Sequence, residues 1–115
     1  MAVSIPSITP GVLDPNGKII NNVYRYMKSG NGTVVTAGTP VRLSVTSQEA
    51  KVIDIINPTT NADILVIGDS TVNHSPLKGI PIQPGFSYRL QITDISNVWV
   101  DAAANGYTFS YNYFY

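Results

Sequence analysis

Hydrophobic and polar residues alternate along short stretches of this chain, and turn residues separate the stretches. In Phe86–Ile92 every second residue is apolar, and the residues between them are polar or charged. A period of two is typical of a strand with one face in the core and one in water. Ile64–Ile67 is continuously apolar instead, which predicts a strand buried on both faces. The residues that we expect to face the core in the first stretch are Phe86, Tyr88, Leu90 and Ile92.

Turn signals between these stretches set the fold class. Asn31-Gly32 and Asn105-Gly106 are typical of tight turns, and Pro81 marks its segment as an edge strand or as a segment outside any ladder. We count about seven or eight short strands and no helical pattern, which favours a sandwich or barrel. Thr71–Lys78 lacks a pattern and is interpreted as a surface loop. The sequence therefore predicts an all-β fold: one β-sandwich, jelly-roll-like, or a small barrel of antiparallel strands.

The first thirty residues differ from the rest because they contain three prolines and no clean alternation. Two interpretations compete. The segment forms a hairpin across Asn16-Gly17, or it is an extended arm that pairs with a neighbouring subunit. We favour the arm, and divide the chain into an attachment arm (residues 1–30) and a β-sandwich domain (residues 31–115). The arm residues that we expect at an interface are Ile5, Ile8, Val12 and Leu13.

The last strand, Tyr107–Tyr115, places an aromatic residue at every second position. Such a row can form one wall of the core or a subunit interface, and it can also form a platform for sugars or unstacked bases. We favour the core or the interface, because a tyrosine ring packs well while its hydroxyl reaches a polar partner. The predicted interface residues of this strand are Tyr107, Phe109, Tyr111 and Tyr113.

Charge changes the expected partners. The 115 residues carry 7 basic and 7 acidic side chains, so the formal net charge is zero and a nucleic-acid partner is not expected. Charged residues make up 12% of the chain, about half of the ~25% of typical soluble domains. This favours permanent assembly, and we expect a homo-oligomer. No apolar run approaches the roughly 18 residues that span a bilayer, so no membrane partner is expected either.

Candidate catalytic residues are few. His74 is the sole histidine, and together with Asp69 and Ser70 it would complete a Ser–His–Asp set, but no nucleophile elbow accompanies Ser70. Asp69 and Asp94 could in principle act as a carboxylate pair on a glycoside. We favour the alternative that both acids end strands through side-chain turns. The chain has no cysteine, and we expect no enzyme activity, metal or cofactor.

Seven short segments occur in a characteristic order: Gly38–Leu43, Lys51–Ile55, Ile67–Ser70, Gly79–Ile82, Pro84-Gly85, Asp94–Ser96 and Val98–Ala102. This order resembles a small β module of virion proteins of tailed bacteriophages, which occurs in capsid-associated and tail-associated roles. The resemblance covers roughly residues 33–114. It implies a structural β-sandwich with no catalytic residues to transfer to this chain.

The resemblance implies a function in the virion. We expect a capsid decoration (cement) protein, assembled in the host bacterial cytoplasm, that binds and stabilises the shell of the major capsid protein. Such proteins often sit around a symmetry axis of the capsid as trimers, so the resemblance favours a trimer. The first thirty residues lie outside the resemblance, which agrees with an attachment arm. Two alternatives stay open: a tail or fibre component, and a module that binds host glycans through Tyr107–Tyr115 or Thr71–Lys78.

Overall fold

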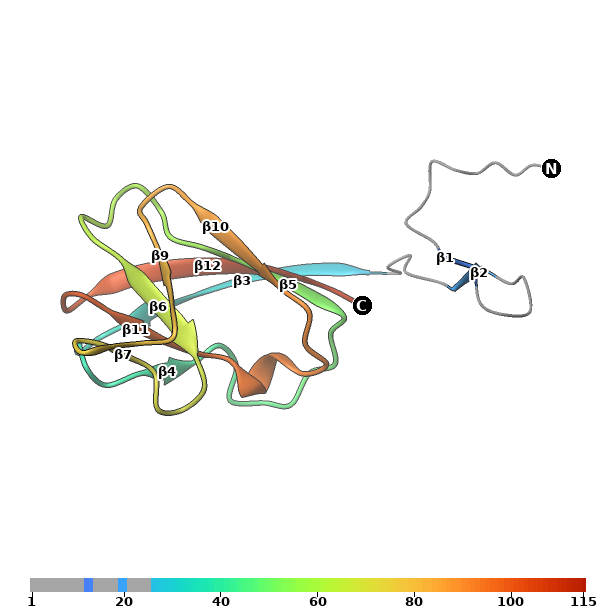
Figure 1. The fold of residues 1–115 in the computed structure, drawn as a ribbon, viewed down its shortest axis with the longest axis horizontal. Coiled ribbons are helices and arrows are strands. Elements are labelled where there is room, and N and C mark those ends of the chain that lie inside the picture. Colours follow the sequence, from blue (N-terminus) through green and yellow to red (C-terminus); the bar gives the residue numbers. More distant parts are fainter. Residues whose placement is uncertain (1–11, 14–18, 21–25) are drawn as a thin grey trace.

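The computed structural model describes residues 12–13, 19–20 and 26–115. Two four-stranded antiparallel sheets form a sandwich (Figure 1). The first sheet has the order β10-β5-β12-β3 and the second β4-β11-β6-β9. The prediction of a single all-β sandwich is confirmed. The strands of the first sheet are β3 (Met27–Val34), β5 (Val52–Ile56), β10 (Ser87–Leu90) and β12 (Tyr107–Phe114). Those of the second are β4 (Val41–Arg42), β6 (Leu65–Gly68), β9 (Ile80–Ile82) and β11 (Trp99–Ala102).

The core lies between the two sheets and is built from aliphatic residues of the central strands. Ile53 and Ile55 on β5 point inward, as do Leu65 and Ile67 on β6, and all four are fully buried. The continuous apolar run of Ile64–Ile67 is explained by a second packing layer. Val66, which lies between the two core residues of β6, is also fully buried on the opposite face of the sheet.

The predicted burial of Phe86 and Tyr88 is wrong. Phe86 is 66% exposed and Tyr88 is 40% exposed, whereas Leu90 and Ile92 pack partly against the core. β10 is an edge strand that pairs only with β5 among the described strands. Alternation sets the side to which a residue points, but it does not reveal whether the opposite layer extends that far.

β3 corrects two predictions about the start of the domain. It begins at Met27, so residues 27–30 belong to the sandwich and not to the preceding segment. Asn31-Gly32 lies within this strand and is not a turn, because β3 pairs without interruption with β12. Asn105-Gly106 does form the predicted turn: Gly106 has a φ of 81° and leads into β12.

The N-terminal hairpin consists of β1 (Val12–Leu13) and β2 (Ile19–Ile20). Val12 pairs with Ile20 and Leu13 with Ile19, in the antiparallel sense. These residues therefore form the hairpin that the sequence analysis treated as the alternative to an extended arm. Ile5 and Ile8 lie outside the described residues.

A second small hairpin lies on the outer face of the second sheet. β7 (Asn73–His74) pairs with β8 (Leu77–Lys78) inside the segment that we expected to be a loop. The chain packs here against β6 and β11, and Val72, at the entry to β7, is buried. A Cβ at Gly79 would lie 2.7 Å from Val72 Cγ2 and 2.9 Å from Val66 Cγ1. Residues 72–79 therefore form a third layer, here called the cover.

Candidate functional site

The aromatic residues of β12 form a continuous row on the core side of the first sheet. The ring centroids of Phe109 and Tyr111 are 6.4 Å apart, and those of Tyr111 and Tyr113 are 6.2 Å apart. Tyr115 continues the row 5.7 Å from Tyr113, and Tyr26 lies 5.4 Å from Tyr115. Aromatic pairs at this spacing stabilise the packing of the rings along β12.

The burial of the rings indicates whether this row packs in the core or binds a ligand. Phe109 is 2% exposed and Tyr113 is 7% exposed, while Tyr107, Tyr111 and Tyr115 are partly buried against the same core. A sugar platform needs an open ring face, and these rings are turned toward one another and toward the second sheet. The residues of this strand, for which we favoured the core or an interface, thus mainly form one wall of the chain's own core. Tyr26, at the outer end of the row, is the exposed member at 57%.

Two glycines of β3 make room for the row. A Cβ at Gly32 would lie 2.5 Å from Phe109 Cζ, and a Cβ at Gly30 would lie 2.5 Å from the Tyr111 Cζ and hydroxyl. The two rings therefore reach from β12 across the neighbouring strand, where side chains are absent. The glycines serve close ring packing, which explains why the Asn31-Gly32 turn prediction failed.

The rings of the row extend toward an open edge of the first sheet. β3 is the last strand of the first sheet, and β12 is its one neighbour among the described strands. Tyr26 and Tyr115 exchange both backbone hydrogen bonds, at 2.7 and 2.9 Å. Because such pairs alternate in an antiparallel ladder, Lys28, Gly30 and Gly32 also direct their backbone groups to β12. The residues whose backbone groups point outward are Met27, Ser29, Asn31 and Thr33.

The opposite edge of the first sheet is shorter. β10 spans Ser87–Leu90, against the eight residues of β3. Asn57 donates to the Phe86 carbonyl, so by the same alternation the backbone groups of Ser87 and Arg89 point outward. The Arg89 side chain is engaged on the outer face of the sheet. Its Nε and Nη2 donate to the two carboxylate oxygens of Asp54 at 2.7 and 2.8 Å, and its guanidinium lies 5.7 Å from the Phe114 ring centroid.

A polar cluster around Asp101 fastens the cover to the second sheet. Asp101 lies on β11 with its side chain fully buried. One carboxylate oxygen accepts from the Gly38 N–H at 2.8 Å, and the other accepts from the His74 N–H at 2.8 Å. His74 Nδ1 also lies 2.8 Å from that second oxygen. The cluster thus joins the turn before β4, the cover and β11.

The electrostatics of this cluster favour an ionised carboxylate. Burial by itself would raise the Asp101 pKa, but hydrogen bonds from His74, Ala102 and Gly38 outweigh it, so the pKa lies below its usual value. Asp101 was not predicted as a site residue from the sequence. The one available signal was an acid between two apolar residues of a buried strand, Val100 and Ala102, where an unpaired charge would be costly.

The Ser–His–Asp arrangement considered in the sequence analysis does not form. The His74 ring pairs with Asp101, whereas Asp69 accepts from the backbone N–H and the hydroxyl of Thr71 at 2.8 and 2.6 Å. Within the described part of the chain, Asp101 is the one hydrogen-bond partner of the His74 ring. The cluster therefore has an oriented imidazole and no nucleophile beside it.

Asp94 also has a structural role. It caps the short 3-10 helix η2 (Ile95–Asn97) by accepting from the Ser96 N–H at 2.9 Å, and it also accepts from Gln48 N–H and the Ser47 hydroxyl. These hydrogen bonds, led by that of Ser47, lower the Asp94 pKa, and those of Thr71 lower the Asp69 pKa. A glycosidase general acid needs a raised pKa. Both acids make the predicted side-chain turns, but only Asp69 directly follows a strand; Asp94 lies beyond the end of β10 and begins η2.

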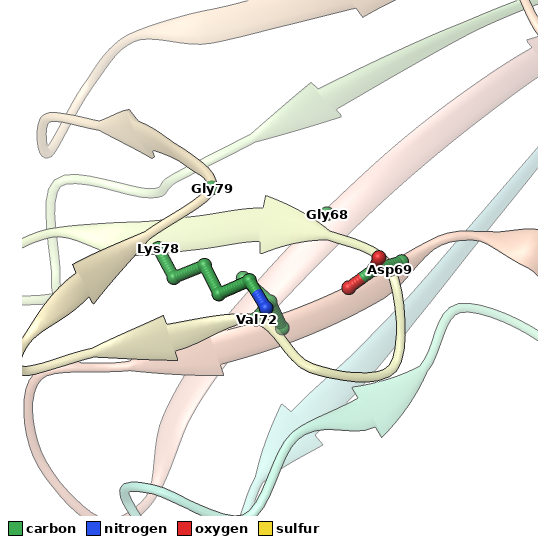
Figure 2. A pocket seen from close by; sticks show the side chains of 5 residues that line it. All are labelled: Gly68, Asp69, Val72, Lys78 and Gly79. Atoms are coloured by element: carbon green, nitrogen blue, oxygen red, sulfur yellow. The ribbon is translucent and has the colours of Figure 1, made fainter.

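A small open depression borders the cover (Figure 2). It has a volume of about 220 Å³ and is lined by Gly68, Asp69, Val72, Lys78 and Gly79. Figure 2 shows the Lys78 side chain extending along the depression toward Asp69. Ligand pockets usually enclose about 300–1,000 Å³ with convergent polar groups. This depression is smaller and open, so it does not favour a glycan site at Thr71–Lys78.

Comparison with protein-family models, with curated proteins and with solved structures finds no match for this chain. In the described part of the chain, no three His, Asp or Glu side chains are grouped so that they could hold a metal ion. Among the same residues, no helix is long and apolar enough to cross a membrane. Among the edge strands of the two sheets, β3 is the longest in the described part of the chain.

Proposed function

We propose that this chain is a structural protein of a tailed-phage virion, and specifically a capsid decoration protein that binds and stabilises the major capsid shell. The proposal rests on the resemblance described above and on the low content of charged residues. It assigns the chain a binding function and no catalysis. A tail-associated location is the close variant of the same proposal.

The single observation that favours an attachment role is the edge of β3. An eight-residue strand ends the first sheet with outward-pointing backbone groups, and Lys28 is its one charged side chain. Soluble proteins usually protect such edges with several charges, proline or a bulge. An extended segment of another protein can add to this edge as a further strand, with main-chain hydrogen bonds providing affinity.

Exposed apolar side chains lie at both edges of the same sheet. Tyr26 is 57% and Met27 is 58% exposed beside β3, and Phe86 is 66% exposed beside β10. Large apolar groups beside a free edge are typical of interfaces that become buried on assembly. The glycan alternative has no comparable support, because the ring faces of β12 are packed within the sandwich.

The test is co-sedimentation of the full chain with separated phage heads and tails that lack it. Saturable binding to heads, at a fixed number of chains per shell, supports the decoration role. Saturable binding to tails selects the tail-associated variant. Binding to neither particle overturns the proposal.

A matched pair of variants assigns the contact surface. Thr33→Pro removes an outward backbone donor from β3, and Ser87→Pro does the same on β10. If β3 is the attachment edge, Thr33→Pro weakens binding to heads and Ser87→Pro does not.

A further inference from the structure

We infer that the open edge of β3 pairs antiparallel with β3 of a second copy of this chain, about a twofold axis at Gly30. The first sheets of two copies then form one continuous sheet. This inference goes beyond the proposed attachment to a shell, because it concerns the free protein, in which a second copy occupies the edge of β3 that a shell segment would take on binding.

Backbone geometry at the edge is self-complementary in this register. The axis places Met27 opposite Thr33 of the second copy, and Ser29 opposite Asn31 of the second copy. All four residues direct their N–H and C=O groups outward, so each pair exchanges two hydrogen bonds. None of these side chains is charged, so no like charges face each other on this side of the sheet.

On the core side of the first sheet, the residues of β3 also leave room for a second copy. Gly30 lies opposite Gly30 of the second copy, and Lys28 lies opposite Gly32. A lysine often prevents pairing at a sheet edge. Here Lys28 lies opposite a glycine, Gly32 of the second copy. The aliphatic part of Lys28 therefore has room beside Phe109 of the second copy, whose ring tip covers that glycine.

The ring of Tyr111 restricts which strand can approach. Its hydroxyl lies 2.5 Å from the position that a Cβ on Gly30 would take, so the ring tip reaches the middle of the edge. A partner strand with a bulky residue opposite Gly30 would meet this ring tip. A second copy presents a glycine there and brings its own Tyr111 to the other side of the axis.

The expected contact is modest in area. Seven paired residues span about 24 Å, and strand pairing alone covers less than the roughly 800 Å² per partner of a standard interface. Tyr26 and Met27 add exposed apolar area at the ends of the contact. We therefore expect a dimer that dissociates on dilution and that a shell segment adding to the same edge replaces. The twofold axis predicts this dimer in place of the trimer expected from the sequence.

The first test is sedimentation equilibrium of the full chain over concentrations that span roughly three orders of magnitude. The mass is expected to rise from monomer to dimer. Asn31→Pro removes one outward N–H without breaking a hydrogen bond to β12, and we expect it to weaken association at least about tenfold. Ser87→Pro, at the outward position of β10, is the matched control and should leave the mass curve unchanged.

The second test reads the register directly. The chain has no cysteine, so Ser29→Cys/Asn31→Cys places thiols only at the proposed contact. In the paired register their Cα atoms lie about 5.5 Å apart across the axis, within the range for a disulfide. Oxidation by glutathione disulfide is expected to yield a covalent dimer. Ser87→Cys/Arg89→Cys, with the same spacing on β10, should remain monomeric.

Three outcomes would overturn the inference. They are a monomer at every concentration, equal weakening by Asn31→Pro and Ser87→Pro, and cross-linking no greater than that of the β10 control. If circular dichroism shows that Asn31→Pro is unfolded, the cross-linking result decides. All of these measurements use the free protein, so failure to bind phage heads would count against the proposed function and not against the pairing.

Discussion

Backbone polar groups at the edge of the first sheet lie at the surface, whereas those on the outer face of the second sheet are hydrogen-bonded within the chain. At β3 the outward backbone groups of Ser29 and Asn31 lie at the surface, with no described strand beside them. On the second sheet the N–H groups of Gly38 and His74 are taken up by the buried carboxylate of Asp101. Buried polar groups need partners within the same chain, whereas surface groups remain hydrated until another chain replaces the water. The difference indicates which side is closed and which can still accept a partner.

Side-chain packing also differs between the edge of β3 and the cover. Beneath the open edge, Phe109 and Tyr111 fill the space above two glycines, so ring packing and backbone pairing occur on one strand. Beneath the cover, Val66 and Val72 form a small apolar layer that depends on the Asp101 cluster to remain in place. Substitutions at Phe109 should therefore affect the whole sandwich, and substitutions at Asp101 should mainly release the cover.

The largest effect is expected for Phe109→Ala. Removal of a ring that is 2% exposed leaves a cavity between the sheets and should lower the free energy of unfolding by about 4 kcal/mol. Urea unfolding followed by tryptophan fluorescence measures this change. Tyr107→Ala, at the partly buried end of the row, is the control and should cost clearly less; equal losses would contradict the assignment of Phe109 to the centre of the core.

Asp101→Ala should have the next largest effect. It leaves the Gly38 and His74 N–H groups without their acceptor, which should cost about 3 kcal/mol. Hydrogen exchange should show faster exchange at His74 and Gly38 and unchanged exchange in β5 and β12. Asp69→Ala, an exposed acid with purely local hydrogen bonds, should have little effect. Uniform loss of protection across the sandwich would show that the cover is not a separate unit.

Gly32→Ala should cost about 2 kcal/mol, because the new Cβ would meet the Phe109 ring, which has no free space into which to move. Gly30→Ala is the matched control. The same approach distance there involves the tip of the half-buried Tyr111 ring, which can turn toward solvent. Thermal unfolding of the two variants compares them directly, and a greater loss for Gly30→Ala would contradict the ring arrangement.

The smallest expected effect is on how stability changes at acidic pH. In the folded chain the Asp101 pKa is lowered from its usual value of 3.8. The ionised Asp101 carboxylate therefore contributes fully to stability at any pH well above 3.8. The contribution is lost as the pH falls through the lower folded-state pKa. Urea midpoints measured from neutral pH down to about pH 2 should fall less for Asp101→Asn than for the unaltered chain. Since Asp69 and Asp94 also have lowered pKa values, this difference between the two proteins is what isolates Asp101. Parallel curves would contradict the assignment.

Much of the sheet structure could be predicted from local patterns. The alternation in Tyr107–Tyr115, the apolar run at Ile64–Ile67 and the turn at Asn105-Gly106 correspond to β12, β6 and the connection into β12. Pro81 lies in an edge strand, one of the two positions that the sequence allowed for it, because a proline has no backbone N–H to donate to a neighbouring strand. These features depend on a residue's immediate neighbours in the chain, so the sequence carries them.

The site could be predicted only in part. The aromatic row was recognised, and the core was one of the two favoured positions for it. The choice between core and subunit interface could not be made, because it depends on a second sheet contributed by distant residues. Asn31-Gly32 was assigned to a turn because the rings that lie over β3 come from a strand more than seventy residues away. Asp101 and His74 were not linked, since 27 residues separate them and no spacing rule connects them.

By itself the sequence determined an all-β chain, its main strands, and the absence of cysteine and of net charge. These properties follow from local periodicity and from counting side chains. Only the tertiary structure decided that the rings face inward, that Asp101 fastens a cover, and that β3 ends its sheet. The physical reason is that strand order and burial result from contacts between segments far apart in the chain. A residue pattern specifies which face is apolar, but the order of the strands decides which edge stays open.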